Sequence, residues 1–467
     1  MHRLVFGILL VAASCQQATE KQDSGKVRLF GQIEGDSPSG QTIQLFDALD
    51  REMTSDIAED GRFSLEMPLS SPGYFLLRVD SKPIQLYLSE NYNLTLRLEA
   101  GSPEVQITGR GSENNQYIRA FERFEAANKP AYDRLLVRHE EDFLLEARRY
   151  RSKCEAFLSN YQAKNVNLDP KFISKERARI LYAWANRLVQ YPEAHLFYTG
   201  EDEFAVSANY HDYKKTVNLD AIDLLTLPEY QNFVTSYIDY EAEILKKKGD
   251  KRDLDQIRFD LVTQDINETG VRDFAMFSIL RRAMQHGLSG VTKDLLSIFY
   301  DQCQNSLMLA EIRGEEHGWL RIAPGKTAPA IKGVTLSGER VNLSQFEGKF
   351  IYLNFWASWC TPCTSEYATF AHVAEVIDSN SIVLMSISLD TDRDIWQRHS
   401  RERTKPVIDL FLTKDVVNEV REEYQIRSLP RYILVDPSGK IIDSNAPGPS
   451  DAALLSLLAS FELAALD

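Results

Sequence analysis

Residues 350–363 read Phe-Ile-Tyr-Leu-Asn-Phe-Trp-Ala-Ser-Trp-Cys-Thr-Pro-Cys, a largely apolar run that ends in a Cys-x-x-Cys motif. The apolar part, 350–356, is typical of a strand buried on both faces of a sheet. The residues that follow have apolar side chains at helical spacing and predict a helix over 361–377. A buried strand that leads into a cysteine pair at the start of a helix predicts a redox site.

The position of the two cysteines predicts their roles. The start of a helix favours a thiolate at Cys360 and lowers the pKa of that thiol below its free value of about 8.5, so Cys360 is the expected nucleophile. Cys363 lies within one helical turn and can attack the mixed disulfide that Cys360 forms. Pro362 suits this first turn because the helix does not use the donor that proline lacks.

Two other interpretations of the motif are weaker. A zinc site needs two more ligands, and the sequence has neither a second cysteine pair nor histidines at a ligand spacing. A structural disulfide across so short a loop constrains the unfolded chain little. We therefore expect catalytic cysteines, with no metal and no cofactor.

Beyond the motif, strands and helices alternate. The pattern predicts a buried strand over 381–389, helices over 390–401, 414–424 and 452–466, and a hairpin of strands 431–435 and 440–442. Alternating strands and helices are typical of an α/β sheet, so residues 322–467 are expected to form one α/β domain.

The first part of the chain has a different period. Over 27–111 apolar and polar residues alternate, as at Leu94, Leu96 and Leu98, and turn residues separate the short runs. The pattern predicts about seven strands in an antiparallel, sandwich-like all-β domain.

Residues 112–321 change to a helical period and predict an all-α region. Helices are expected over 117–127, 133–161, 174–189 and 274–308, with a further helix starting near Pro228. Along that helix the side chains Tyr230, Phe233, Val234, Tyr237 and Ile238 share one face. We interpret this aromatic stripe as core, because such spacing usually marks a buried face.

The first 26 residues predict export and anchoring. Residues 1–15 have a basic start, a short apolar run and small residues before Cys15, which resembles a bacterial lipobox whose cysteine is lipidated. An ordinary cleaved signal is the alternative. Residues 16–26 are polar and would form a tether. The apolar run is too short to span a membrane, so anchoring would depend on the lipid.

Composition excludes other classes of partner. The chain has 43% hydrophobic and 26% charged residues, as soluble globular proteins have, and a net charge of -15. This negative charge opposes binding to nucleic acid through a basic surface. Of the remaining cysteines, Cys154 and Cys303 lie alone in helical patterns and are expected to be buried apolar residues.

From about Ala323 to its end the chain resembles the membrane-tethered, TlpA/ResA-like thioredoxin-like reductases of the AhpC/TSA-related superfamily. The matching features are Ala328-Pro329, Gly338 with Val341-Asn342-Leu343, Gly348-Lys349, the stretch 353–363, Glu366, Leu429-Pro430 and 435–439. The resemblance implies a C-terminal α/β thioredoxin fold, in a multidomain chain whose β and helical domains have no assigned role.

The resemblance also implies residue roles. Pro430 is similar to the cis-proline that faces the dithiol in this fold, and the open backbone of Leu429 would pair with an extended substrate segment. Trp359 would offer an apolar contact surface, with Thr361 and Pro362 beside it; a packed core tryptophan is the alternative.

Glu366 stands at the position of the glutamate that handles protons in this family, although it could equally be a partner of the helix dipole. Asn354 stands where thioredoxin has a buried Asp, and because Asn takes no proton, Glu366 or water would have to do so. A peroxiredoxin would need Thr or Ser where the chain has Ala357 and Pro where it has Leu353, so peroxidase activity is not expected.

Together these features predict an extracytoplasmic thiol:disulfide oxidoreductase, facing the periplasm or cell envelope of a Gram-negative bacterium. It would reduce or isomerise disulfides of exported proteins through Cys360 and Cys363. The resemblance implies a membrane dithiol carrier as its electron donor. The alternative is a lipid-anchored binding lipoprotein whose β and helical domains capture a partner or ligand. The Thr-Pro pair between the cysteines does not define the redox direction.

Overall fold

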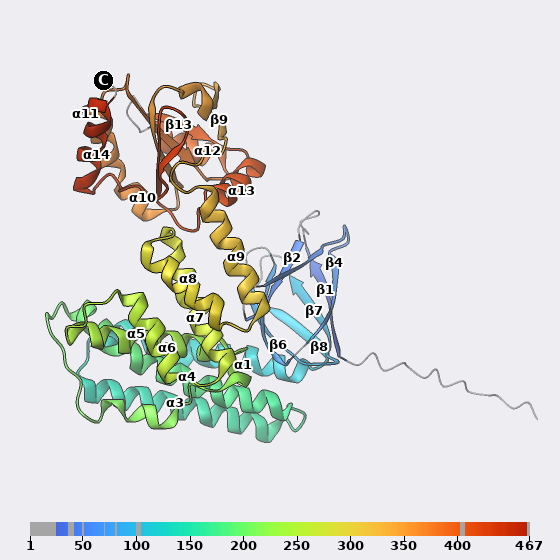
Figure 1. Cartoon of the computed structure of the whole chain (residues 1–467). Helices are drawn as coiled ribbons and strands as arrows, with labels where there is room; N and C mark the ends of the chain where they lie inside the picture. The colour runs from blue at the N-terminus through green and yellow to red at the C-terminus, as the bar shows by residue number, and fades with distance from the viewer. Residues whose placement is uncertain are drawn as a thin grey trace, which may run out of the picture. The chain divides into compact units, whose positions relative to one another are not determined.

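The computed structural model describes residues 25–35, 42–48, 51–69, 71–79, 82–99, 104–401 and 407–464 (Figure 1). The expected export signal, Cys15 and nearly all of the tether lie outside these residues. The chain forms two compact units: one reaches Asn218 and includes Asp223–Ser236, and the other consists of Leu219–Ile222 and the chain from Tyr237 onward. Within the described ranges, no helix combines the length and apolar character needed to cross a bilayer.

The first unit begins with the predicted β domain. Its strands are β1 (Lys26–Glu34), β2 (Thr42–Phe46), β3 (Glu52–Asp56), β4 (Arg62–Pro68), β5 (Gly73–Val79), β6 (Lys82–Leu88), β7 (Asn93–Glu99) and β8 (Val105–Arg110). They form two sheets of four strands, in the orders β4-β1-β7-β8 and β3-β2-β5-β6. All pairs are antiparallel except β1 with β7, which is parallel. The sandwich-like all-β class is confirmed, with one strand more than predicted among the described residues.

The period-two pattern predicts the faces of these strands correctly. In β7 exposed and buried residues alternate along the whole strand, and Leu94 and Leu96 are fully buried. A half-buried strand places every second side chain in the core, which is why the alternation was informative.

The helices of the first unit are α1 (Ser112–Asn128), α2 (Tyr132–Leu136), α3 (Glu140–Lys164), α4 (Pro170–Thr199), the short helix η1 (Tyr210–Thr216), part of η2 (Ile222–Leu224) and the start of α5 (Pro228–Lys247). The single helix predicted over 133–161 is wrong, because α2 ends at Leu136. Two carbonyls near this break accept hydrogen bonds from α4: Leu136 O from His195 Nδ1 at 2.6 Å, and Arg138 O from the Tyr191 hydroxyl at 2.7 Å. Tertiary hydrogen bonds therefore stabilise the break.

A largely buried ion pair within α4 is hydrogen-bonded to the β domain. Glu176 is fully buried, and its carboxylate accepts a hydrogen bond from the Tyr74 hydroxyl of β5. Arg179 donates to the same carboxylate from Nε at 3.0 Å and from a terminal nitrogen at 2.6 Å, and its guanidinium lies 4.2 Å from the ring of Phe121 in α1. Burial by itself lowers the pKa of Arg179, but the Glu176 carboxylate raises it well above its ordinary value.

The second unit contains the rest of α5 and the helices α6 (Leu254–Asp265), α7 (Thr269–Ala283), η3 (Met284–His286), α8 (Gly290–Gln302) and α9 (Ser306–Arg321). The stripe predicted along α5 crosses from the first unit into the second: Tyr230, Phe233 and Val234 are fully inaccessible and Ile238 is buried, as predicted, whereas Tyr237 is half-buried. The stretch 274–308, predicted as helical throughout, is divided among α7, α8 and α9. Ser289 and Asn305 each accept backbone hydrogen bonds at a helix start, and these caps separate the three helices.

The C-terminal α/β domain has one sheet of seven strands in the order β10-β9-β13-β12-β11-β14-β15. The strands are β9 (Lys332–Val334), β10 (Arg340–Asn342), β11 (Phe350–Trp356), β12 (Ile382–Ser388), β13 (Ile408–Phe411), β14 (Arg431–Val435) and β15 (Ile441–Asp443), with the short helix η4 (Leu343–Phe346). Strands β11, β12, β14 and β15 agree with the prediction. Strands β9, β10 and β13 were not predicted; in β13 the polar residue Asp409 interrupts the apolar run.

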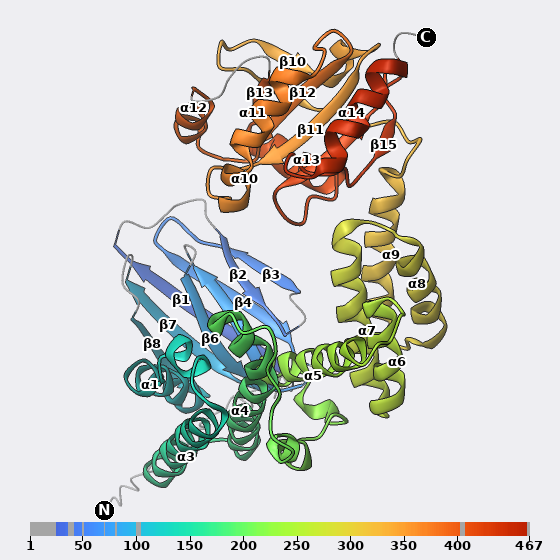
Figure 2. The same cartoon turned by 90° about the vertical axis from the view of Figure 1, so that its left-hand side faces the viewer.

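The helices of this domain are α10 (Thr361–Ser365), α11 (Tyr367–Val376), α12 (Arg393–Arg401), α13 (Lys414–Glu423) and α14 (Ala452–Ala464) (Figure 2). One core cluster packs α11 and α14 onto the face that carries Tyr352 of β11 and Leu384 of β12. Tyr424, at the end of α13, contacts Phe355 on the other face, with ring centroids 5.2 Å apart. The predicted helix 361–377 is divided by a turn at Glu366.

Candidate active site

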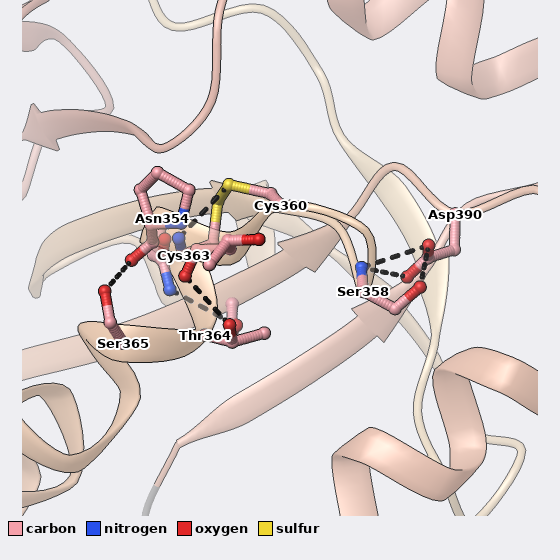
Figure 3. The surroundings of a disulfide bond; sticks show 10 residues. Asn354, Ser358, Cys360, Cys363, Thr364, Ser365 and Asp390 are labelled. Carbon is pink, nitrogen blue, oxygen red and sulfur yellow. Dashed lines mark hydrogen bonds between the residues drawn. A yellow bond between two sulfur atoms is a disulfide. The ribbon is translucent and has the colours of Figure 1, made fainter. Parts of the chain in front are cut away.

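Cys360 and Cys363 form a disulfide where β11 leads into α10 (Figure 3). Cys360 occupies the N-cap of α10, and the backbone N–H of Cys363 donates a hydrogen bond to Cys360 Sγ at 3.1 Å. Both residues are largely buried. A backbone donor directed at this sulfur stabilises negative charge there when the bond is reduced, which is the local basis for the expected thiolate at Cys360.

Apolar side chains surround the disulfide. Trp356, Trp396 and Phe411 form a buried cluster with the two cysteines, and Leu429 packs against it. The rings of Trp396 and Phe411 lie 5.3 Å apart. The bond between Leu429 and Pro430 is cis, which confirms the geometry that the resemblance implied. Residues from four separate segments of the chain thus meet at the sulfurs.

One side of the motif faces solvent. The side chain of Trp359 is 64% exposed, so it is not a core tryptophan, and Thr361 and Pro362 are exposed as well. The carbonyls of these last two residues accept hydrogen bonds from the hydroxyls of Thr364 and Ser365, both within α10. The exposed apolar indole lies directly before the buried Cys360, where a partner could contact both.

Glu366 contacts a different part of the domain. Its carboxylate accepts hydrogen bonds from the backbone N–H of Ser450 at 3.0 Å and from the Ser450 hydroxyl at 2.5 Å, just before α14. Burial, with a smaller contribution from this carboxylate, raises the pKa of Tyr432. The hydrogen bonds to Ser450 connect the start of α11 to the segment before α14, and they do not involve the cysteine sulfurs.

Asn354 lies in the surroundings of the disulfide (Figure 3). It is buried in β11, and its Nδ2 donates to Ser386 Oγ of β12 at 3.5 Å. The register places Asp409 of β13 beside Ser386, and Asp409 Oδ1 accepts a hydrogen bond from the Trp396 indole N–H at 3.3 Å. A row of polar side chains thus crosses the central strands below the motif.

The sequence did not identify Asp390, which holds the loop before Cys360. Both carboxylate oxygens accept from the backbone N–H of Ser358 at 3.1 Å, and further bonds come from the hydroxyls of Ser358 and Ser388, each at 2.8 Å (Figure 3). Asp390 is buried, so these bonds have little competition from water. An acidic residue directly after a buried strand was the available signal.

The remaining cysteines differ from the pair. Cys154 and Cys303 are buried, as predicted, and neither forms a disulfide, a point that the sequence had left open. Burial raises the pKa of both thiols, for Cys303 to about 11. Thiols of this kind are poor nucleophiles at neutral pH. Among the residues that the structure describes, no group of three or more His, Cys, Asp or Glu side chains is arranged to hold a metal ion.

Known proteins resemble this domain. Residues 324–444 match the AhpC/TSA family. The thiol-disulfide oxidoreductase ResA of Bacillus subtilis is 25% identical over 121 residues, which are 26% of this chain and 66% of the relative. The thioredoxin-like protein YneN of the same organism is 28% identical over 123 residues, 26% of this chain and 71% of the relative. The chain thus spans just under two thirds of the ResA relative. The residues that match the AhpC/TSA family lie within the C-terminal domain.

Solved structures with related sequences come from the same class of protein. The thioredoxin domain of a Bacteroides vulgatus thiol-disulfide oxidoreductase is 30% identical and covers 30% of this chain and 97% of its own, with a TM-score of 0.28. A Bacteroides thiol:disulfide interchange protein is 31% identical and covers 30% of this chain and 90% of its own, with a TM-score of 0.28. From its sequence match and its cysteine-bearing sheet, the C-terminal part of this chain is a TlpA/ResA-like thioredoxin-fold domain.

Proposed function

We propose that the chain is an extracytoplasmic thiol:disulfide oxidoreductase that reduces or isomerises disulfides of exported proteins. The observation that carries this proposal is the Cys360–Cys363 disulfide at the N-cap of α10, with an N–H group directed at Cys360 Sγ. The names of the ResA relatives support the same reaction class.

In the reductive direction, the thiolate of Cys360 attacks one sulfur of a substrate disulfide. The substrate S–S bond breaks, and the departing thiolate takes up a proton. Cys363 then loses its thiol proton and attacks Cys360 Sγ, which breaks the mixed disulfide and releases the second substrate thiolate to be protonated. The substrate gains two electrons and two protons, and the chain is left with the disulfide seen in the structure.

The surface around the motif supports the substrate roles that the resemblance implied. Trp359 offers an exposed apolar face, Thr361 and Pro362 are exposed as well, and Leu429 packs against the cysteine cluster. An extended peptide could pair with the open backbone of Leu429 while its disulfide meets Cys360. Glu366 remains a candidate for proton handling only if its bonds to Ser450 open during turnover.

The first test is reduction of insulin disulfides by the full chain. Cys360→Ser should abolish the reaction, because no thiolate remains to attack. Cys363→Ser should still attack but should accumulate the mixed disulfide, visible as a covalent complex on a non-reducing gel. Equal rates for the wild type and Cys360→Ser would contradict the proposal. The reduction potential of the cysteine pair would then define the direction.

Location and partners need separate tests. Incorporation of a labelled fatty acid that is lost in Cys15→Ala would support the lipid anchor, and a membrane dithiol carrier should regenerate the reduced pair in envelope preparations. Rescue of a deletion strain by a Cys360→Ser/Cys363→Ser double variant would instead favour a binding lipoprotein.

A further inference from the structure

Helix α9, the last helix before the α/β domain, is packed against the part of that domain that leads to Leu429 and Pro430. The guanidinium of Arg431 lies over the ring of Trp319 in α9, with its central carbon 4.7 Å from the ring centroid. Both side chains are buried, at 4% exposed for Trp319 and 5% for Arg431. Both belong to the second compact unit, so this contact lies within one body.

Arg431 has few other partners. One terminal nitrogen donates to Asn445 Oδ1 at 2.5 Å, whereas Nε and the other terminal nitrogen have no hydrogen-bond partner among the described residues. Burial lowers the pKa of Arg431 to about 10, although the Asp443 carboxylate acts in the opposite direction, so the group stays charged near neutral pH. The face of the Trp319 indole is therefore a principal stabilising contact for this cation.

Arg431 connects directly to the redox site. It follows Pro430 in the chain, and its register partner in the sheet is Phe355, next to Trp356 of the cysteine cluster. Leu429, two residues before Arg431, packs on that cluster. A shift of Arg431 therefore moves the backbone that would hold an extended substrate.

A second contact holds the same segment from α9. A Cβ atom on Gly318 would lie 2.4 Å from the side-chain amide of Gln425, so only glycine allows this approach without movement. Gln425 has a positive φ of 51°, and its amide donates to Glu422 O at 2.6 Å and accepts from Arg427 at 3.3 Å. The loop from Tyr424 to Pro430 is thus packed against α9 at one end and joined to Arg431 at the other.

Helix α9 is in turn tied to the helical region. Arg281 of α7 lies 3.6 Å from the carboxylates of Glu311 and Glu315 on α9. Trp319 also faces Gly287, which follows η3; a Cβ atom built there would lie 3.7 Å from the indole. Trp319 therefore sits between the helical region and Arg431.

We propose that Trp319 is a positioning residue: through its contact with Arg431, the helical region fixes the position of the Leu429–Pro430 segment, against which extended disulfide substrates bind. The inference rests on the proposed function and deepens it, because it gives the helical region a part in substrate binding. Trp319 does not contact the cysteines, so it should affect how a peptide is held and leave the exchange between sulfurs unchanged.

The test compares two substrates on the full chain: a disulfide-linked peptide, which needs the Leu429 backbone, and 2-hydroxyethyl disulfide, which is too small to use it. In Trp319→Leu the KM for the peptide should rise about tenfold, while kcat/KM for the small disulfide stays within about twofold of the wild type. Trp319→Phe keeps an aromatic face and should restore most of the peptide KM.

Tyr300→Leu is the matched control. Tyr300 lies under Arg313 of α9 at 5.4 Å, and its hydroxyl donates a hydrogen bond to Glu316 of the same helix at 2.6 Å. Its replacement therefore removes contacts of α9 that do not involve Arg431. It should change neither substrate. Gly318→Ala provides a second test if Trp319→Leu does not fold. Its added methyl group would displace Gln425 in the loop before Pro430 and should raise the peptide KM about threefold.

Equal losses for both substrates in Trp319→Leu, or an unchanged peptide KM in both Trp319→Leu and Gly318→Ala, would overturn the inference. A wild-type chain that reduces neither substrate would overturn the proposed function, and the inference with it.

Discussion

Arg179 and Arg431 both lie over aromatic rings and are largely inaccessible to solvent, and they differ in what else stabilises their charge. Arg179, in the first unit, makes three hydrogen bonds to the carboxylate of Glu176, two of them from Nε, and lies 4.2 Å from the ring of Phe121. Arg431, in the redox domain, lies 4.7 Å from the Trp319 ring and makes one hydrogen bond, to a neutral Asn. The pKa of the first is raised by its carboxylate, whereas burial lowers that of the second to about 10.

The difference separates an arginine held by a carboxylate from one held by an indole face and a neutral amide. Removing one partner of a buried ion pair leaves the other charge buried without an opposite charge beside it, so Arg179 and Glu176 should both contribute to stability. Replacing Arg431 should lower the free energy of unfolding less, because its buried charge has few stabilising partners in the native structure. Its effect should be seen mainly in where the Leu429–Pro430 segment lies.

The largest expected effect is on the Glu176 pair. Glu176→Ala leaves the buried guanidinium of Arg179 without its main partner and should lower the free energy of unfolding by about 3–5 kcal/mol. Denaturant unfolding of the full chain, with hydrogen exchange of α4 peptides to assign the transition, measures it. Because the chain has two units, each transition should be fitted separately.

The double variant Glu176→Leu/Arg179→Met is the control for that prediction. It removes both charges and fills the space with apolar atoms, so most of the stability should return. If Glu176→Ala lowered the free energy of unfolding by less than about 1 kcal/mol, the Glu176 pair would contribute no more than a surface ion pair, and it would not differ from Arg431 in this respect.

Arg431→Met should have a smaller effect on stability. It removes one hydrogen bond and the indole contact but also relieves the cost of a buried charge, so we expect a net loss of about 1 kcal/mol. Tryptophan fluorescence reports on it, since Trp319, Trp356, Trp359 and Trp396 lie in the second unit. A loss as large as that of Glu176→Ala would show that both arginines are structural.

The smallest expected effect depends on pH. Burial raises the pKa of Glu229, and Arg179, 3.9 Å away, only partly offsets this. The folded state therefore binds the Glu229 proton more tightly than the unfolded chain does. The stability that this proton contributes is fully present below about pH 4.5 and is lost as pH rises through the raised pKa of Glu229 in the folded state. Glu229→Gln should be more stable than the wild type by a few tenths of a kcal/mol at pH 7, an advantage absent at pH 4. Parallel stability curves from pH 4 to 7 would contradict this.

The sequence predicted the parts of the fold that repeat a simple period. The alternation in β7, the stripe on α5 and the apolar run of β11 each depend on one buried face, which a period reveals. The cysteine motif and Pro430 could be located because their local context is distinctive.

Features that depend on contacts far along the chain were missed. The break after α2 is stabilised by Tyr191 and His195 from α4, and β13 is a strand although Asp409 interrupts its apolar pattern. Asp390 and Trp319 act on residues 32 and 112 positions away, and no local pattern carries that information. Glu366 was expected inside one helix but lies at the turn between α10 and α11, and its bonds to Ser450 could not be read from spacing.

The close approach of Gly318 to Gln425 should restrict which residues related chains have at these positions. A helix interior is a costly place for glycine, and here the closeness of Gln425 is the reason to keep it. Positions 318, 319, 425 and 431 should therefore change together across related chains. Relatives that consist of a redox domain alone should be free to vary at the positions of Gln425 and Arg431, so this covariation would reveal which relatives carry a helical region docked in the same way.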